Sequence, residues 1–357
     1  MTTTRLDTNK AEAFAERLLD ILNSGAIALA MSLGHRTKLW DAMENLPPST
    51  SHQIADAAGL NERYVREWLA IMVTGRFVDY DRANKIYYLP PEHAAFLTRS
   101  ASSDNLATFA QYIAQLGSVE DRIVQCFHRG GGVPYRYFNR FHQIMAEDSG
   151  QTVVAHLIDS ILPVIPGLID ALERGISVLD VGCGSGKALN RMAQAFSNSQ
   201  FKGYDFSREA IANAQTEAQQ LKLTNIEFEV KDAATIDEVE QYDLITTFDA
   251  IHDQAKPDVV LKNINRALRP NGFYLMQDIR AKTEVGDNLD HPLAPVLYTV
   301  SCMHCMTVSL AEGGMGLGTM WGEEKTLEML QSAGFKSIKI EQLDHDITNN
   351  FYIIQKS

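Results

Sequence analysis

The most constraining feature of this chain is the stretch at residues 178–186, which reads Val-Leu-Asp-Val-Gly-Cys-Gly-Ser-Gly. An apolar strand ends in a carboxylate, three alternating glycines follow, and residues 187–196 have the pattern of a helix. Glycine accepts positive φ and leaves no Cβ between the backbone and a ligand. The helix that follows presents free N–H groups. Strand, glycine turn and helix in this order predict a nucleotide-binding corner of an α/β fold.

The spacing of the three glycines indicates which class of nucleotide the turn would bind. Gly182, Gly184 and Gly186 form Gly-x-Gly-x-Gly, not the Gly-x-Gly-x-x-Gly of dinucleotide enzymes. The carboxylate of Asp180 suits a cationic ligand better than a phosphate. The stretch resembles the first motif of class I S-adenosylmethionine (SAM) methyltransferases. That resemblance implies SAM as cofactor and a Rossmann-like, seven-stranded α/β sheet, with the glycines and Asp180 at the methionine end.

Polar residues that follow the later predicted strands strengthen this interpretation. Strands are expected at residues 200–204, 226–230, 242–248 and 273–276, and each is followed by a polar residue at the edge where open α/β sheets bind ligands. Asp205 lies about 20 residues beyond the glycines, where a nucleotide fold places the acid for the ribose hydroxyls. The resemblance implies that Asp232 meets adenine. The expected cofactor site comprises Asp180, Gly182, Gly184, Gly186, Asp205, Phe206, Asp232, Ala233 and Asp249.

Composition sets the broad class. A chain of 357 residues with 45% hydrophobic content predicts two domains. A net charge of −13 argues against nucleic-acid or anionic-membrane partners, and no stretch approaches the roughly 20 apolar residues that span a bilayer. Four cysteines in so long a chain predict free thiols, and with no apolar signal core at the N-terminus we expect a cytoplasmic protein.

The N-terminal region is expected to be a winged helix. Residues 11–34 have helical spacing, residues 54–73 read as helix, glycine turn and helix, and residues 77–89 read as a hairpin. Residues 35–100 contain eight basic and eight acidic side chains, and this balance disfavours DNA binding. The resemblance to small-molecule methyltransferases implies a homodimerisation role instead. We expect this domain at residues 1–100, a helical linker and substrate-pocket region at 101–165, and the SAM-binding domain at 166–357.

His252 is the candidate general base. It follows the fourth predicted strand, and a neutral imidazole can accept a proton from a phenol, hydroxyl or thiol. His252-Asp253 resembles the His-Asp-Trp of plant-type small-molecule O-methyltransferases, whose His is the catalytic base, although Gln254 replaces the Trp. The stretch Glu324-Lys325-Thr326 resembles the Glu-Arg-Thr of the same family. The resemblance implies that Glu324 orients His252.

Acceptor-binding residues are expected around this base. Tyr135 belongs to an aromatic cluster after a glycine loop, which is either a docked loop or a pocket wall. Met303 and His304 lie in Cys302-Met303-His304-Cys305. The Cys-x-x-Cys spacing is one that zinc ligands adopt, which makes a zinc site a hypothesis to weigh. No further ligand pair is obvious, so no metal is expected. The expected substrate-binding residues are Tyr135, Asp253, Asp278, Met303 and His304.

As a whole the chain resembles bacterial SAM-dependent methyltransferases with an N-terminal winged helix. We expect a cytoplasmic homodimer that methylates a small molecule, most readily on oxygen with His252 as base. S-methylation of a small thiol or thioether acid is an alternative, and a thioether carries no proton to remove. A SAM-sensing winged-helix transcriptional regulator is an alternative of another class.

Overall fold

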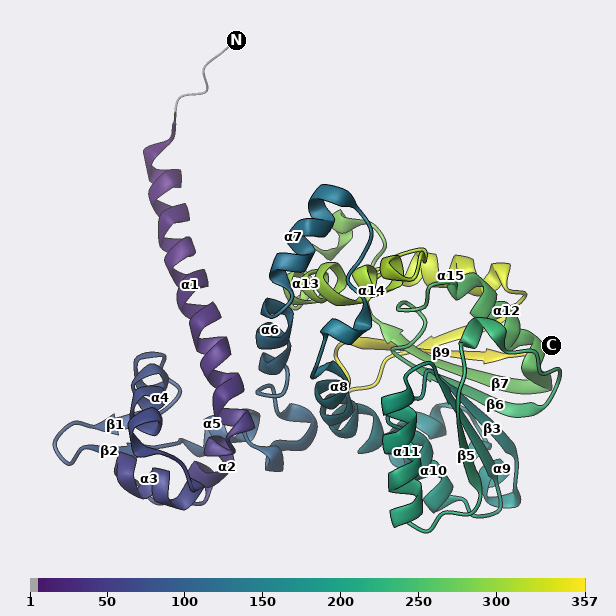
Figure 1. The fold of residues 1–357 in the computed structure, drawn as a ribbon, viewed down its shortest axis with the longest axis horizontal. Helices are drawn as coiled ribbons and strands as arrows, with labels where there is room; N and C mark the ends of the chain where they lie inside the picture. Colours follow the sequence, from purple (N-terminus) through teal and green to yellow (C-terminus); the bar gives the residue numbers. More distant parts are fainter. Residues whose placement is uncertain (1–5, 357) are drawn as a thin grey trace. The chain divides into compact units, whose positions relative to one another are not determined.

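The computed structural model describes residues 6–356 and divides the chain into two compact units, residues 1–114 and 115–357 (Figure 1). The first unit is helical with one hairpin. The second is built on a seven-stranded sheet. Helix α6 (Ala110–Gly117) spans the division.

The first unit has the order of a winged helix. Its elements are α1 (Thr8–Arg36), α2 (Leu39–Glu44), α3 (Ser51–Ala58), α4 (Glu62–Thr74), β1 (Asp79–Asp81), β2 (Ile86–Tyr88), α5 (Pro91–Leu97) and a 3-10 segment (Arg99–Asp104). A capping box between Thr50 and Gln53 begins α3, and Gly59 with φ +65° ends it. The strands β1 and β2 pair antiparallel as the expected wing.

Two tryptophans anchor the core of this unit against α1. The rings of Trp40 and Trp68 meet edge to face with centroids 4.7 Å apart. Their indole N–H groups donate to the α1 carbonyls of Met31 and Ala30. Gly34 of α1 lies directly against both rings, and a Cβ there would come within 2.6 Å of each. Only a residue without a side chain lets α1 approach so closely.

The second unit is a doubly wound α/β layer structure. Its strands are β3 (Ser177–Val181), β4 (Gln200–Asp205), β5 (Ile226–Val230), β6 (Tyr242–Phe248), β7 (Leu268–Ile279), β8 (Ser337–Glu341) and β9 (Asn349–Gln355). They form the order β5-β4-β3-β6-β7-β9-β8, in which β9 pairs antiparallel with both β7 and β8 and the pairs from β5 to β7 are parallel. The chain order reverses between β3 and β6, which is the switch point where open α/β sheets bind ligands.

Helices cover both faces of the sheet (Figure 1). Those in the two cores are α9 (Leu168–Arg174), α10 (Lys187–Ala195), α11 (Arg208–Gln220), α12 (Pro257–Ala267) and α15 (Glu323–Ser332). The other helices of this unit are α7 (Glu120–Arg129), α8 (Phe141–Ser149), α13 (Ala294–Val300) and α14 (Met306–Ala311). Buried residues alternate along the strands: Leu179 and Tyr352 join the core beneath α12 and α15, whereas Val178 and Phe351 join the core beneath α9, α10 and α11.

The fold confirms the class expected from the sequence and refines some bounds. The turn expected at residues 269–272 lies inside β7, which begins at Leu268 and pairs with β6 through a bulge. Helices α13 and α14 join through a π-helical turn (Ser301–Cys305) into one helical run. Further π-helical turns occur at Gly150–Val154 and Leu157–Ile161.

The expectation that no segment reaches membrane-spanning length is corrected. Two helical runs, Thr8–Arg36 and Ala294–Ala311, are long and apolar enough to cross a bilayer by length and composition. The expectation concerned uninterrupted stretches of apolar residues, whereas these two helical runs include a few polar residues. Core helices pass the same measure, so the finding is weak evidence of a membrane segment.

Gly34→Ala should destabilise the winged-helix unit because its new methyl group would overlap both indole rings, and overpacking of this kind costs about 1–3 kcal/mol. The matched control is Gly25→Ala on the same helix, where a Cβ meets nothing within 4 Å. That change should stabilise α1 by up to about 1 kcal/mol. Thermal unfolding of both variants checks the pair, and equal shifts would contradict this packing.

Candidate functional site

The glycine turn after β3 adopts the conformation that its sequence demands. Gly182, Gly184 and Gly186 all have positive φ, at +75°, +51° and +69°. A Cβ on Gly182 would lie 2.6 Å from the Cβ of Ala250, and one on Gly186 would strike Phe228. At Gly184 a Cβ would meet open space. The turn is therefore packed at both ends and open at its middle, and α10 begins behind it without a side-chain cap.

Asp180 is a buried carboxyl group beneath this turn. It is 2% exposed, and Thr246 of β6 donates its hydroxyl proton to Oδ1 at 2.8 Å. Burial raises the pKa of Asp180 to about 7, against the opposing effect of the Thr246 hydrogen bond. A positive charge beside it would favour the ionised form.

Asp205, at the end of β4, holds the turn in place. Its Oδ2 accepts the N–H of Gly184 at 2.9 Å, and its Oδ1 accepts the N–H of Ser207 at 2.8 Å. Burial raises the pKa of Asp205, although these two backbone bonds oppose the rise. The acid predicted for the ribose and the predicted glycine turn thus form one hydrogen-bonded unit.

The other predicted cofactor residues lie at the ends of β4, β5 and β6. Phe206 directly follows Asp205 and is 57% exposed. Asp232 is exposed and caps a short 3-10 turn that contains the buried Ala233. Asp249 follows β6 with φ +49°, an uncommon conformation for a residue other than glycine. One of its carboxyl oxygens is buried without a hydrogen-bond partner among the described residues.

His252 lies deep in the same edge and is held by Asp278. Its Nδ1 is 2.7 Å from Oδ1 of Asp278, which also accepts the indole N–H of Trp321 at 3.0 Å. Burial alone would lower the pKa of His252. The charges of Asp278 and Asp253 outweigh that effect and hold the pKa well above its usual value.

Carboxylates surround this imidazole on several sides. Asp253 brings Oδ1 to 3.4 Å from Nε2 of His252. Donor atoms of Asp249, His252 and Asp278 lie within 4.8 Å of one another, and so do those of His252, Asp253 and Cys305. Burial raises the pKa of Asp249 well above its usual value, with a further contribution from the charge of Asp278. Within residues 6–356, His252 is the only cation in the ion pairs of Asp253 and Asp278.

The expected partner of His252 is corrected. Glu324 lies at the start of α15, where it accepts the N–H of Thr283 at 2.9 Å and pairs with Lys282. These bonds, the Thr283 bond first, lower the pKa of Glu324 to about 2. The structure places Asp278, not Glu324, on Nδ1 of His252. The short side chain of Asp278 starts from β7, the strand next to β6, and so reaches the imidazole directly.

His304 and Tyr135 form an aromatic wall near the base. The imidazole of His304 is fully buried and stacks on Phe141, with Phe138 and Tyr135 edge-on. Burial lowers the pKa of His304 well below its usual value, so this ring is neutral. Its Nε2 has no hydrogen-bond partner among the described residues. Met303, the remaining predicted substrate residue, is half-buried in the same π-helical turn.

The predictions missed His142, which joins the aromatic wall to the end of β4. Its Nδ1 lies 3.4 Å from the hydroxyl of Tyr135, and its Nε2 lies 3.2 Å from the hydroxyl of Ser207. The pair Phe141-His142 on a helix matches no motif, so nothing in the sequence distinguished His142. The Tyr135 segment is also tied to α14, where Thr307 accepts the N–H of Val133 at 2.8 Å.

Cys302 and Cys305 do not come together as the pair of zinc ligands that their spacing suggested. Cys305 is buried beside His252 and His304, whereas Cys302 is half-buried. Across residues 6–356, no close group of three or more possible metal ligands contains both cysteines. Burial raises the pKa of the Cys305 thiol to about 12, so it carries a proton at neutral pH.

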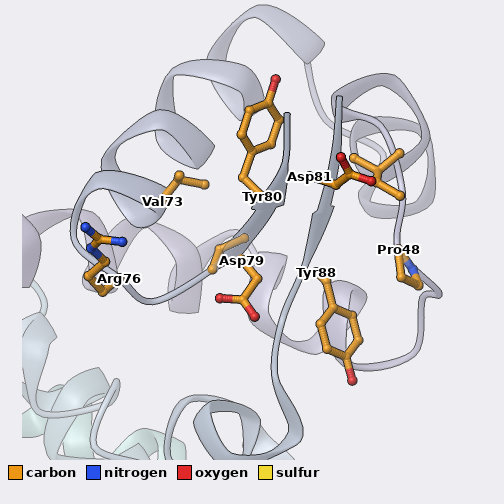
Figure 2. Close-up of a pocket in the computed structure, with 9 residues that line it drawn as sticks. Pro48, Val73, Arg76, Asp79, Tyr80, Asp81 and Tyr88 are labelled. Atoms are coloured by element: carbon orange, nitrogen blue, oxygen red, sulfur yellow. The ribbon is translucent and has the colours of Figure 1, made fainter. Parts of the chain in front are cut away.

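Two cavities lie in different units. One of about 610 Å³ lies beside the wing of the first unit, where Arg76, Asp79 and Tyr88 line it (Figure 2). The other, of about 270 Å³, lies between α8, α10 and α11 and reaches Ser185 of the glycine turn and His142. Only the second cavity adjoins the residues that the sequence singled out.

Comparison with protein families matches both units. Residues 25–99 match an Rv2258c-like winged HTH domain, and residues 172–343 match a methyltransferase domain. Among curated relatives, (S)-coclaurine N-methyltransferase of Papaver somniferum is 30% identical over 31% of this chain and 32% of its own length. Fatty-acid O-methyltransferase of Mycolicibacterium smegmatis is 24% identical over 44% of this chain and 53% of its own length. The chain thus spans about a third to a half of these relatives.

Solved structures share the fold over nearly the whole chain. Human N-acetylserotonin methyltransferase in complex with SAM superposes with a TM-score of 0.67 at 16% identity, covering 100% of both chains. Mitomycin 7-O-methyltransferase superposes with a TM-score of 0.70 at 16% identity, covering 98% of this chain and 100% of its own. At this identity the likeness concerns the fold.

The buried carboxyl of Asp180 predicts a pH-dependent effect on stability. Its folded pKa of about 7 exceeds the unfolded value near 4, so the folded chain holds the extra proton between these pH values. Stability from this group therefore falls as pH rises from about 4 to about 7. Asp180→Asn has no proton to lose, so its melting temperature should gain on the wild type as pH rises from 5 to 8. A constant difference between the two proteins would contradict this.

Proposed function

We propose that this chain, a winged helix-turn-helix domain followed by a methyltransferase domain, is an enzyme that transfers the methyl group of SAM to a small-molecule acceptor. The observation that carries the proposal is one edge of the sheet. There the glycine turn, the Asp205 carboxylate bonded to it, and the His252–Asp278 pair all lie at the carboxyl ends of neighbouring parallel strands. The matching methyltransferase domain, residues 172–343, contains every one of these residues.

The residues at this edge fit SAM by shape and charge. The open middle of the turn at Gly184 leaves room for a ligand against the backbone. Asp180 would serve the methionine end, Asp205 the ribose, and Asp232 with Phe206 the adenine. The cluster of Asp249, Asp253 and Asp278 suits a positively charged ligand, because His252 is the only cation paired with it in the described chain. When bound, SAM supplies an electrophilic methyl group on a positively charged sulfur.

His252 is the general base of this proposal. Asp278 holds Nδ1 with its proton, so Nε2 is the atom that would accept the proton that the acceptor gives up. A base is needed for a hydroxyl, phenol or thiol but not for a thioether. The fully buried His252–Asp278 pair therefore favours an acceptor that loses a proton, and O-methylation leads. Tyr135, Met303 and His304 would line the apolar part of the acceptor pocket.

The winged helix is proposed to serve dimerisation. In α1 the side chains of Phe14, Leu18, Leu19, Ile21 and Leu22 are 45–69% exposed, more apolar surface than a lone helix carries without a partner. In α4 the basic residues pair with acids of the same helix, Arg63 with Glu67 and Arg66 with Glu62. These internal pairs leave little positive charge for a nucleic acid. A second copy of α1 is the partner that fits.

His252→Gln should lower turnover by roughly a hundredfold or more, because a positioned general base contributes at least that much. SAM binding should persist. In the wild type the rate should rise with pH, because the base works only after losing its proton, and the variant should lack that rise. Transfer of labelled methyl from SAM to a panel of phenols, alcohols and thiols is the assay. His345→Gln, which changes a half-buried imidazole of the same unit, is the control. Unchanged turnover in His252→Gln would remove its assigned role.

Leu22→Glu should convert the dimer to monomers. Leu22 is exposed in a single chain, and dimerisation would bury the new carboxylate in the apolar contact between two copies of α1. The control is Asn23→Glu, which adds the same charge one residue along, about 100° around the helix. Light scattering during gel filtration measures both masses. A wild-type monomer, or a Leu22→Glu dimer as stable as the wild type, would refute α1 as the interface.

A further inference from the structure

The imidazole of His252 faces titratable groups from several elements of the second unit. Asp249 and Asp253 follow β6, Asp278 ends β7, and Cys305 and His304 lie in the π-helical turn. Two of these groups are neutral at neutral pH. The Cys305 thiol keeps its proton, and the His304 imidazole has none to add. Of the three carboxyl groups, Asp278 and Asp253 favour a proton on His252, whereas burial raises the pKa of Asp249 well above its usual value and so favours its neutral form.

This arrangement creates a conflict with the proposed role of His252. A general base must be unprotonated at Nε2, yet Asp253 lies 3.4 Å from that atom and Asp278 lies 2.7 Å from Nδ1. In the protein by itself the charge of these acids holds the proton in place. A ligand that binds during the reaction cycle must therefore offset the carboxylate charges that stabilise this proton.

The glycine turn lies close enough for its ligand to do so. A Cβ on Gly182 would touch the Cβ of Ala250, which is two residues before His252. A ligand seated on that turn therefore brings its charge next to the carboxyl cluster. A unit positive charge about 6 Å from the imidazole, at an effective dielectric constant of about 20, weakens proton binding about a hundredfold.

We propose that the positive sulfur of the methyl donor expels the proton from Nε2 of His252, so that the base is exposed only when the donor is bound. This inference rests on the proposed function. The step is a proton transfer: the Nε2–H bond breaks, its electron pair stays on Nε2, a buffer base in solvent takes the proton, and Nδ1 keeps its proton toward Asp278. The neutral thioether product, S-adenosylhomocysteine (SAH), carries no charge on sulfur and leaves His252 protonated.

Proton release on ligand binding tests the idea directly. The heat of binding of SAM and of SAH is measured by calorimetry near pH 7, in several buffers of different ionisation enthalpy and with a chelator present. The slope of the heat against that enthalpy counts the protons released. SAM should release up to about one proton more than SAH. His252→Gln should release the same number of protons when it binds SAM as when it binds SAH. His345→Gln should keep the wild-type difference in proton release.

A second readout needs no variant that might fail to fold. Imidazole nitrogen NMR of the wild type should show His252 protonated at both nitrogens alone and with SAH, and protonated at Nδ1 only with SAM. Equal proton release for both ligands, a difference that survives in His252→Gln, or an unchanged His252 spectrum with SAM would overturn the inference while leaving SAM binding intact. Absence of heat from both ligands would overturn the proposed function and this inference together.

Discussion

The parallel arrangement of β4, β3, β6 and β7 is the constraint on which the site depends. Parallel strands deliver their carboxyl ends to one edge, so residues far apart in sequence meet there without any special loop. Asp180, Asp205, Asp249 and Asp278 each lie at or just after such an end. The result is a concentration of buried carboxyl groups that a surface loop could not hold together.

Burial makes this concentration of acid expensive, and the structure moderates the cost by several means. Backbone N–H groups bond Asp205, the Thr246 hydroxyl bonds Asp180, and His252 pairs with Asp278. The pKa values of Asp180 and Asp249 still rise. An edge with surplus negative potential selects a cationic ligand over a phosphate, so the same electrostatics accounts for the proposed cofactor and for the proposed control of the base.

Local patterns predicted most of the fold. The glycine turn, the strand at residues 226–230 and the strand at 242–248 were correct, because apolar runs ended by turn residues are determined within a few positions. The π-helical turn at Ser301–Cys305 was not predicted. Its apolar and polar residues follow no period distinct from an α-helix, and its contacts with Phe141 and His252 come from segments distant in sequence.

The site was predicted less completely than the fold. His252 followed from its place after a strand, but its partner did not. The motif resemblance favoured Glu324 as this partner and gave Asp278 no such support, and only the packing of β7 against β6 shows that Asp278 reaches His252. His142 and Trp321 contribute hydrogen bonds to the same region through contacts between distant segments. Such contacts leave no trace in spacing or composition.

The most direct test of this account is a crystal structure of the full chain with SAH. We expect the nucleoside to lie across residues 182–186, with its ribose hydroxyls on Asp205 and its sulfur directed toward His252. A ligand bound elsewhere, or an empty edge at saturating ligand, would contradict the assignment of this edge as a methyl-donor site.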